Sequence, residues 1–348
     1  MSGHVSRRAF GALVGGLAVT AASSARAQKL EIVKVGLTNV ATDIGLFVAD
    51  KRGYFRDEGL DVQFTTFDSA ARMMAPFASG ELDVSAGAPS AGFFNAVGRG
   101  IDMRIVADKV STPPGRPSQT LVVGKALVDS GRFKTLADLK GLKFANTAPG
   151  TAAWGTMYRI LERAGLKPSD VDLVSLSFPQ QVIALANGAI DVALPAEPMT
   201  TEAVAKGYGV KIITDDEVFP NHQIAVIFYS GKFANERAPL ARKFMKAFLR
   251  GVRDHNDGLD EKGMFKGDKG EAIIAILNEY TSIKNPEFYR SFPLAFCNPD
   301  GTVSIESIKQ DFAAFKAAGF ITSNVDPMKG IDMSFLDAAL KELGPYKK

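Results

Sequence analysis

The sequence contains few of the residues on which thiol and metal chemistry depend. Its 348 residues include one cysteine, Cys297, and three histidines, His4, His222 and His255. One cysteine cannot form an internal disulfide, and we expect Cys297 to pack as a small hydrophobe. No His-Glu-x-x-His, paired-cysteine, Gly-x-Ser-x-Gly or Gly-x-x-x-x-Gly-Lys pattern is present, which removes the usual signatures of zinc sites, serine hydrolases and phosphate loops. The sequence therefore predicts no catalytic residue, no metal and no cofactor.

The apolar segment near the N-terminus is too short for a membrane anchor. Residues 11–22 are rich in Gly and Ala, and a spanning helix needs about 20 apolar residues. Arg7 and Arg8 precede this segment and small residues follow it. This order is typical of a cleaved secretory signal, and the paired arginines favour the twin-arginine route. We expect residues 1–27 to be removed, Gln28 to begin the mature chain, and the protein to be soluble in a bacterial periplasm.

Neither sign of charge is in excess once that segment is removed. The chain has 41 Lys and Arg against 38 Asp and Glu, and residues 1–27 hold three arginines and no acidic residue. The rest of the chain therefore carries 38 of each sign. Binding to a nucleic-acid backbone needs a concentrated positive field. We expect no nucleic-acid partner.

Two distant stretches of the sequence repeat one pattern. FASGELDVSAG (77–87) and LANGAIDVALP (185–195) each place Gly, Leu or Ile, Asp and Val in the same order, and Asp83 and Asp191 are 108 positions apart. Other matches have nearly the same offset: residues 31–39 match 141–149, 49–64 match 157–176, and 98–106 match 205–213. Such a repeat predicts that the chain contains the same structural unit twice.

Each copy of the repeat is predicted to alternate strands with helices. Gly59 and Gly165 follow helical segments, and glycine commonly ends a helix because it adopts the left-handed conformation without steric cost. The apolar run after each glycine suits a buried parallel strand. Strand–helix–strand units build parallel sheets. Residues 31–108 and 140–214 should therefore form two similar α/β lobes, with mostly helical segments after residue 230.

These segments resemble a known family. The signal, GLFVADKRGYFRDEGLDVQF (45–64), FASGELDVSAGAPS (77–90) and ALANGAIDVALPAEPMTTEAVAKG (184–207) are similar to substrate-binding proteins of ABC importers. The branch they resemble includes nitrate, taurine and aliphatic sulfonate binders and the related thiamine-precursor-binding proteins. The resemblance extends to about residue 250 and is specific for the family but not for the ligand.

The resemblance implies the type II periplasmic-binding-protein fold, with two similar α/β lobes and a ligand cleft between them. The first lobe would be discontinuous, formed by residues 28–119 and 223–348, and the second lobe would comprise residues 120–222. The C-terminal helices would pack on the first lobe. The implied partners are a small-molecule ligand and an ABC permease with its cytoplasmic ATPase, and the protein is expected to be a monomer.

The cleft is expected outside the carboxyl ends of the strands, where ligands bind in open parallel sheets. Several of these ends run into helices, whose free backbone N–H groups favour a negatively charged or polar ligand. The candidate ligand-binding residues follow these strand ends or lie near a crossing between the lobes. They are Asn39, Ser69, Ser90, Thr147, Gly150, Thr151, Trp154, Gln180, Glu197 and His222.

Some of these candidates have an alternative structural interpretation. The segment around Gly150 and Thr151 could be an ordinary helix cap, and Trp154 could fill the core instead of stacking on a ligand. Glu197, in the Glu-Pro pair that the family commonly shows, could either receive a ligand amine or serve as a hinge. His222 lies near the second of the two expected crossings between the lobes, at about 215–228, and could reach the cleft from there.

We therefore expect a periplasmic solute-binding protein that captures a small organic anion, such as a sulfonate or carboxylate, by lobe closure and delivers it to an ABC importer. One alternative is a binder of a neutral or cationic pyrimidine-type heterocycle, with Glu197 as its partner. Another is an enzyme similar to the thiamine-pyrimidine synthases. The resemblance implies a cysteine-rich, histidine-bearing sequence pattern for such enzymes, and this chain lacks it. Presentation of the ligand to a sensor is a further possible use.

Overall fold

The computed structural model describes residues 29–348. The predicted signal and its cleavage site lie outside the described residues. Within residues 29–348, no helix has both the length and the apolar character needed to span a membrane.

One five-stranded sheet has the order β2-β1-β3-β10-β4. Strands β1, β2 and β3 are parallel, whereas β10 runs antiparallel to its neighbours β3 and β4. The strands are β1 (Glu31–Leu37), β2 (Leu60–Thr66), β3 (Val84–Gly87), β4 (Met103–Thr112) and β10 (His222–Ser230). The strand that completes this first sheet therefore comes from a distant part of the chain.

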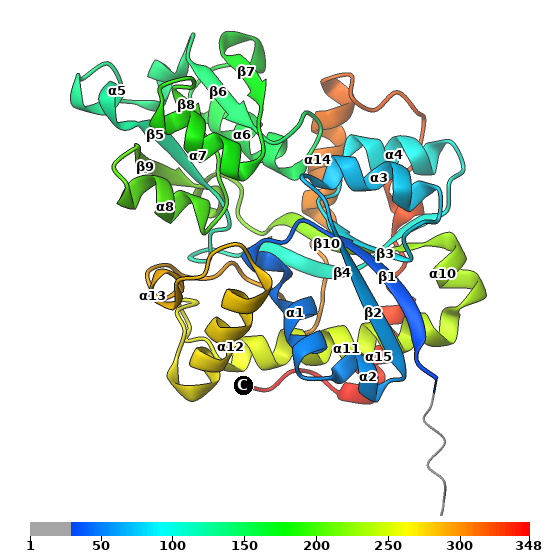
Figure 1. Cartoon of the computed structure of the whole chain (residues 1–348). Helices are drawn as coiled ribbons and strands as arrows, with labels where there is room; N and C mark the ends of the chain where they lie inside the picture. Colours follow the sequence, from blue (N-terminus) through cyan, green and yellow to red (C-terminus); the bar gives the residue numbers. More distant parts are fainter. Residues whose placement is uncertain (1–28) are drawn as a thin grey trace, which may run out of the picture.

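A second five-stranded sheet repeats this arrangement with the order β7-β6-β8-β5-β9. Strands β6, β7 and β8 are parallel, and β5 runs antiparallel to β8 and β9. The strands are β5 (Thr120–Gly124), β6 (Lys143–Asn146), β7 (Asp172–Ser175), β8 (Val192–Ala193) and β9 (Gly209–Thr214). The prediction of two similar α/β lobes is confirmed, and the chain passes between them through residues 113–119 and 219–221 (Figure 1).

The repeated aspartates have the same structural role in both lobes. Asp83 Oδ2 accepts a hydrogen bond from the backbone N–H of Lys34 at 3.0 Å, and Asp191 Oδ2 accepts one from that of Lys143 at 2.9 Å. The backbone N–H of each aspartate donates in return to the carbonyl of the same lysine. Each aspartate thus fixes the start of one strand, β3 or β8, against its parallel neighbour, β1 or β6, which explains why the sequence repeats the pattern.

Helices cover both sheets (Figure 1). Those of the first lobe are α1 (Ile44–Lys51), α2 (Tyr54–Asp57), α3 (Ala70–Ala78), α4 (Ala91–Gly98), α10 (Gly231–Glu236), α11 (Ala238–Asp257), α12 (Gly267–Tyr280), α13 (Pro286–Tyr289) and α15 (Ser334–Leu343). Those of the second lobe are α5 (Lys125–Asp129), α6 (Ala152–Arg163), α7 (Phe178–Ala186), α8 (Met199–Ala205) and α9 (Asp215–Val218). The single helix expected before Gly59 is two helices, because Gly53 between them has a φ of 78°.

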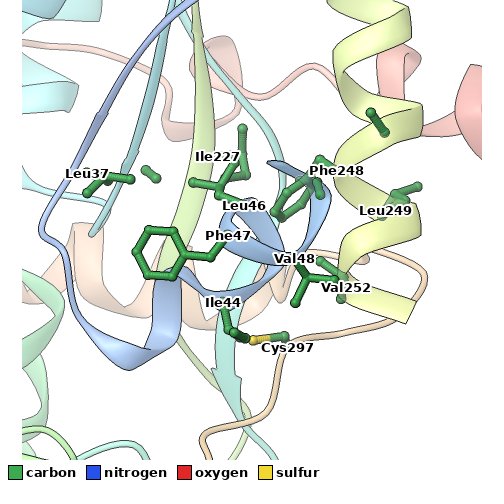
Figure 2. Close-up of a cluster of buried hydrophobic side chains, with 14 of the residues drawn as sticks. Leu37, Ile44, Leu46, Phe47, Val48, Ile227, Phe248, Leu249, Val252 and Cys297 are labelled. Carbon is green, nitrogen blue, oxygen red and sulfur yellow. The ribbon is translucent and has the colours of Figure 1, made fainter. Parts of the chain in front are cut away.

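Cys297 lies in the core of the first lobe. Its side chain is buried beside Ile44 of α1, among the apolar residues that α1 and α11 contribute (Figure 2). Burial raises the pKa of the thiol to about 12, so the thiolate is suppressed at neutral pH. The expectation that Cys297 packs as a hydrophobe is confirmed.

Helix α14 (Ile305–Ala317) packs on both lobes and not only on the first. It contacts α4 and β10 of the first lobe and α6 of the second, and it lies between the two lobes in Figure 1. Phe312 and Phe315 of α14 belong to one apolar cluster that also contains Phe94 of α4 and Trp154 of α6. The lobes are therefore joined by a continuous core along this side of the molecule.

Candidate ligand-binding cleft

A cavity of about 290 Å³ lies between the two sheets. Its lining comes from segments that follow strands of both lobes, as the topology of open parallel sheets predicts. These segments include Asn39 after β1, Phe67 after β2 and Ala88 after β3, with Thr147 after β6, Ser177 after β7 and Ala196 after β8. We refer to this cavity as the cleft.

Four of the predicted residues line the cleft: Asn39, Ser69, Thr147 and Thr151. Ser69 precedes α3, and its side chain makes no capping hydrogen bond, so its hydroxyl is available to a ligand. Thr151 precedes α6, and its hydroxyl accepts a hydrogen bond from the backbone N–H of Trp154 and donates one to the carbonyl of Ala148 at 2.9 Å. The Thr151 hydroxyl is therefore engaged in shaping the start of α6.

Ser90 and Gly150 do not belong to the cleft lining; they form a contact between the lobes beside it. The Ser90 hydroxyl caps α4 by accepting a hydrogen bond from the N–H of Phe93 at 3.2 Å. The carbonyl of Gly150 accepts a hydrogen bond from the N–H of Ala91 at 2.8 Å. Gly150 has a φ of 64°, and a Cβ at this position would lie 2.8 Å from that of Ala91. The glycine thus permits close contact between lobes.

Three further predicted residues are engaged elsewhere in the second lobe. Trp154 is buried against Tyr158, Phe315 and Phe320, which is the core-filling alternative. The side chain of Gln180 accepts a hydrogen bond from the backbone N–H of Ser177 and so caps α7. The Glu197 carboxylate accepts hydrogen bonds from the N–H of Thr201 and the ammonium of Lys211.

His222 is fully buried at the junction of β10, α6 and α14. Its Nε2 lies 2.7 Å from Oδ2 of Asp311 on α14, and its Nδ1 lies 3.3 Å from the hydroxyl of Thr156 on α6. The ring stacks on Phe219 with centroids 4.0 Å apart. Burial raises the pKa of Asp311, and the nearby His222 opposes that rise. His222 therefore connects the lobes inside the core and does not line the cleft.

Lys109 and Gln119 are among the cleft residues that were not predicted from the sequence. Lys109 lies on β4, is 4% exposed, and pairs with Asp43 in the 3₁₀ turn Ala41–Asp43, with 2.5 Å between its Nζ and Oδ1. Gln119 lies in the crossing segment 113–119 and is 2% exposed. A lysine inside the apolar run MRIVADKVST (103–112) was the available signal, because a buried lysine needs a partner.

Three helices begin at the cleft, and this determines its electrostatic character. The residues that precede α3, α6 and α7, namely Ser69, Thr151 and Ser177, all line the cavity. The first N–H groups of a helix lack partners within the helix, and its N-terminus carries about half a positive charge. The cleft is therefore suited to an anionic group. Within residues 29–348, no cluster of three or more His, Cys, Asp or Glu side chains could hold a metal ion.

The sequence profile of the NMT1-like family matches residues 26–257. The chain belongs to the NMT1-like family. Among curated proteins, no sequence matches this chain. Membership of this family and the two-lobed fold confirm the resemblance to the substrate-binding proteins of ABC importers.

Solved structures with the same fold include two ligand-binding proteins. The alkanesulfonate-binding protein SsuA from Xanthomonas axonopodis, bound to MOPS, has a TM-score of 0.69 at 18% identity, with 86% of this chain and 98% of that chain covered. The nitrate-binding protein NrtA from Synechocystis has a TM-score of 0.72 at 14% identity, with 91% and 90% covered. At these identities the similarity establishes the periplasmic-binding-protein fold of this family member.

A third structure shows that this fold also occurs in an enzyme. The desulfurization enzyme DszB has a TM-score of 0.58 at 13% identity, with 90% of this chain and 99% of that chain covered. Because the fold serves both binding and catalysis, the function has to be argued from the cleft.

Proposed function

We propose that this protein is a periplasmic solute-binding protein that captures a small organic anion between its lobes and delivers it to an ABC importer. The observation that carries the proposal is the convergence of the N-termini of α3, α6 and α7 on one cavity. Backbone N–H groups at helix N-termini bind anions well, because they supply donors and partial positive charge without a mobile cation. Lys109, which is paired with Asp43, presents its ammonium group at the same cavity.

The comparisons support an anionic ligand. Alkanesulfonate and nitrate, named for two proteins with the same fold, are both anions. Among the residues described as lining the cleft, the charged ones are Lys109 and Asp68. Asp68 is exposed, whereas Lys109 is buried at the cavity, so the buried surface that a ligand would meet is positive or neutral.

Lobe closure forms part of the proposal. Asn39 and Ser69 of the first lobe and Thr147 and Thr151 of the second face the same cavity, so a ligand held there would touch both lobes. The segment after α12 supports this arrangement: Ser282 lines the cleft, and Ile283 packs against the apolar clusters of both lobes. A ligand that contacts both lobes favours the closed state by its differential affinity.

The alternative ligand is a neutral or cationic heterocycle. Its proposed partner, Glu197, is engaged with Lys211 and with the N–H of Thr201, which leaves Asp68 as the acidic residue of the cleft lining. This distribution of charge favours the anion. The enzymatic alternative has no support among the lining residues, which include no histidine, cysteine or pair of carboxylates.

A thermal-shift screen tests the proposal. The protein would be heated with nitrate and with sulfonates, carboxylates, amines and pyrimidines, each at several concentrations. A ligand at a hundred times its Kd should stabilise the folded protein by about 2.7 kcal/mol. We expect stabilisation by acids, followed by calorimetry to obtain stoichiometry and small-angle scattering to detect compaction. Stabilisation only by amines or pyrimidines would contradict the proposal.

Export is tested separately. Replacing Arg7 and Arg8 with lysine should leave the full-length precursor in the cytoplasm if the twin-arginine route is used. Cell fractionation provides the measurement, and mass spectrometry of the exported protein would show whether Gln28 begins the mature chain. Normal export of the double variant would contradict the twin-arginine route but not secretion itself.

A further inference from the structure

Lys109 presents hydrogen-bond donors to the cleft that it lines. Its ammonium has three N–H donors, and Asp43 is the partner that the described part of the chain provides. The second carboxylate oxygen of Asp43 accepts a hydrogen bond from the backbone N–H of Val40 at 3.0 Å. A buried ion pair gains little net stability, because desolvation offsets the attraction between its charges. The position of this pair at the cavity is better explained by recognition of an acidic group, which can share the remaining donors.

Gln119 is held rigidly, yet its side-chain oxygen has no partner. The backbone N–H of Gln119 donates to the Asp215 carboxylate at 2.9 Å, and its carbonyl accepts from the N–H of Asp215 at 3.0 Å. Oε1 of Gln119, by contrast, is buried without a hydrogen-bond partner among residues 29–348. An unsatisfied buried acceptor destabilises the folded protein, because it has lost its hydrogen bond to water without gaining another. Since Gln119 lines the cleft, a ligand donor would remove that destabilisation.

We propose that Lys109 and Gln119 form a two-part subsite that selects organic acids carrying a second, hydrogen-donating group. Lys109 contacts the sulfonate or carboxylate, and Gln119 accepts a hydrogen bond from a hydroxyl or amino group on the same molecule. This inference rests on the proposed function and names the class of ligand within it. A site whose buried polar group is left unpaired rejects the analogue that lacks the donor.

The test compares acids that differ only in the donor. Calorimetry would measure the Kd of ethanesulfonate, 2-hydroxyethanesulfonate and 2-aminoethanesulfonate, and of propanoate, 3-hydroxypropanoate and 3-aminopropanoate. We expect the wild type to bind at least one donor-bearing acid about tenfold or more tightly than its unsubstituted analogue, since one such hydrogen bond contributes about that factor.

Two variants assign the preference to Gln119. Gln119→Leu should abolish the preference, because it removes the acceptor for the donor group of the ligand. Gln310→Leu makes the same change at an exposed position of α14 and should keep the preference. Retention of the preference in Gln119→Leu would overturn the inference.

The charged part of the subsite needs a variant that does not bury a lone carboxylate. Lys109→Met combined with Asp43→Asn removes both charges and keeps an acceptor for the N–H of Val40. It should weaken binding of every acid about tenfold to a hundredfold, the range for a hydrogen bond to a charged group. Lys125→Met, which breaks the exposed pair of Lys125 with Asp129, is the matched control and should bind normally. Circular dichroism and the melting temperature establish that each variant is folded.

The outcomes separate this inference from the proposed function. If the wild type binds acids but shows no preference for those with a donor, the subsite is wrong and the proposed function stands. Unchanged affinity in the folded Lys109→Met/Asp43→Asn variant would likewise overturn the role of Lys109. If none of the acids binds, the proposed function fails and the inference fails with it.

Discussion

Nε2 of His222 lies 2.7 Å from Oδ2 of Asp311, inside the core that joins the two lobes. The other carboxylate oxygen of Asp311 lies against the backbone of Gly155 in α6, at a place that a Cβ on Gly155 would overlap. The absence of a side chain at residue 155 therefore allows α14 to approach α6 closely enough for the pair to form.

Gly155→Ala should destabilise the protein, contrary to the usual effect of alanine in a helix. Alanine normally stabilises a helix interior by about 0.5–1 kcal/mol relative to glycine, but here the methyl group displaces the Asp311 carboxylate and should cost about 1–3 kcal/mol. Gly92→Ala in α4 is the control, because its Cβ would meet only Ser90 Oγ at 3.6 Å and Met74 at 4.0 Å. Urea unfolding of both variants is the measurement. Equal stabilisation by the two substitutions would show that α6 and α14 are not in close contact.

His255→Leu should protect the protein against acid. His255 is fully buried with no hydrogen-bond partner for either ring nitrogen among residues 29–348, and burial, with the nearby Arg116 adding to it, lowers its pKa to about 3. The unfolded chain binds this proton near pH 6.5, so stability is lost as the pH falls below that value. The advantage of the variant in unfolding free energy should grow by about 2 kcal/mol between pH 7 and pH 5.

The variant has to be compared with the wild type because buried carboxylates, including Asp108 and Asp215, titrate in the opposite sense. Burial raises the pKa of Asp108 and Asp215 to about 7, so their contribution to stability is present at low pH and is lost as the pH rises towards 7. They are present in both proteins and cancel in the difference. A difference that stays constant between pH 7 and pH 5 would show that His255 does not titrate differently in the folded and unfolded states.

Substitution of Ser90 should lower stability without affecting ligand binding, whereas substitution of Thr147 should weaken ligand binding. Ser90→Ala removes the cap of α4 and should cost about 1 kcal/mol of stability, with the Kd for the acid found by screening unchanged within about twofold. Thr147→Val keeps the shape of the side chain, removes a cleft hydroxyl and should weaken binding about tenfold. Chemical unfolding and calorimetry on both variants provide the measurements. Weaker binding in Ser90→Ala with normal binding in Thr147→Val would mean that the ligand lies nearer to α4.

Ile283→Ser should weaken closure. Ile283 packs against the apolar clusters of both lobes next to the cleft, and replacing it with serine removes about 1–3 kcal/mol of apolar contact between the lobes. We expect a roughly tenfold weaker Kd with a faster ligand off-rate, and a larger radius of gyration in the presence of ligand. Ile32→Ser, at an exposed position on β1, should bind normally. Unchanged affinity and unchanged compaction in Ile283→Ser would show that Ile283 does not stabilise the closed state.

The sequence predicted the lobes and the position of the cleft because both depend on local features that recur. The Gly-x-Leu/Ile-Asp-Val pattern marks a helix end followed by a strand, and its two copies, with the other matches at the same offset, indicated the alternating strands and helices of both lobes. Asn39, Ser69, Thr147 and Thr151 were predicted for the cleft because they follow such strand ends, and all four lie in its lining.

The predicted residues that do not line the cleft are held by contacts with distant parts of the chain or with competing neighbours, which a local sequence pattern does not reveal. Trp154 and His222 face α14, which is more than 80 residues further along the chain. The side chains of Gln180 and Glu197 instead accept hydrogen bonds from Ser177 and Lys211. Gln119 carried no signal at all, because its unpaired oxygen becomes apparent only once the crossing segment is folded.

The position of β10 between β3 and β4 has a consequence for how the protein is made. Residues 113–221 lie between β4 and β10, and a ribosome adds about 5–20 residues each second. For several seconds the first sheet therefore has its flanking strands but lacks the one that joins them, and the edges of β3 and β4 stay open to unwanted pairing. A nascent chain thus completes its second lobe before it can finish its first.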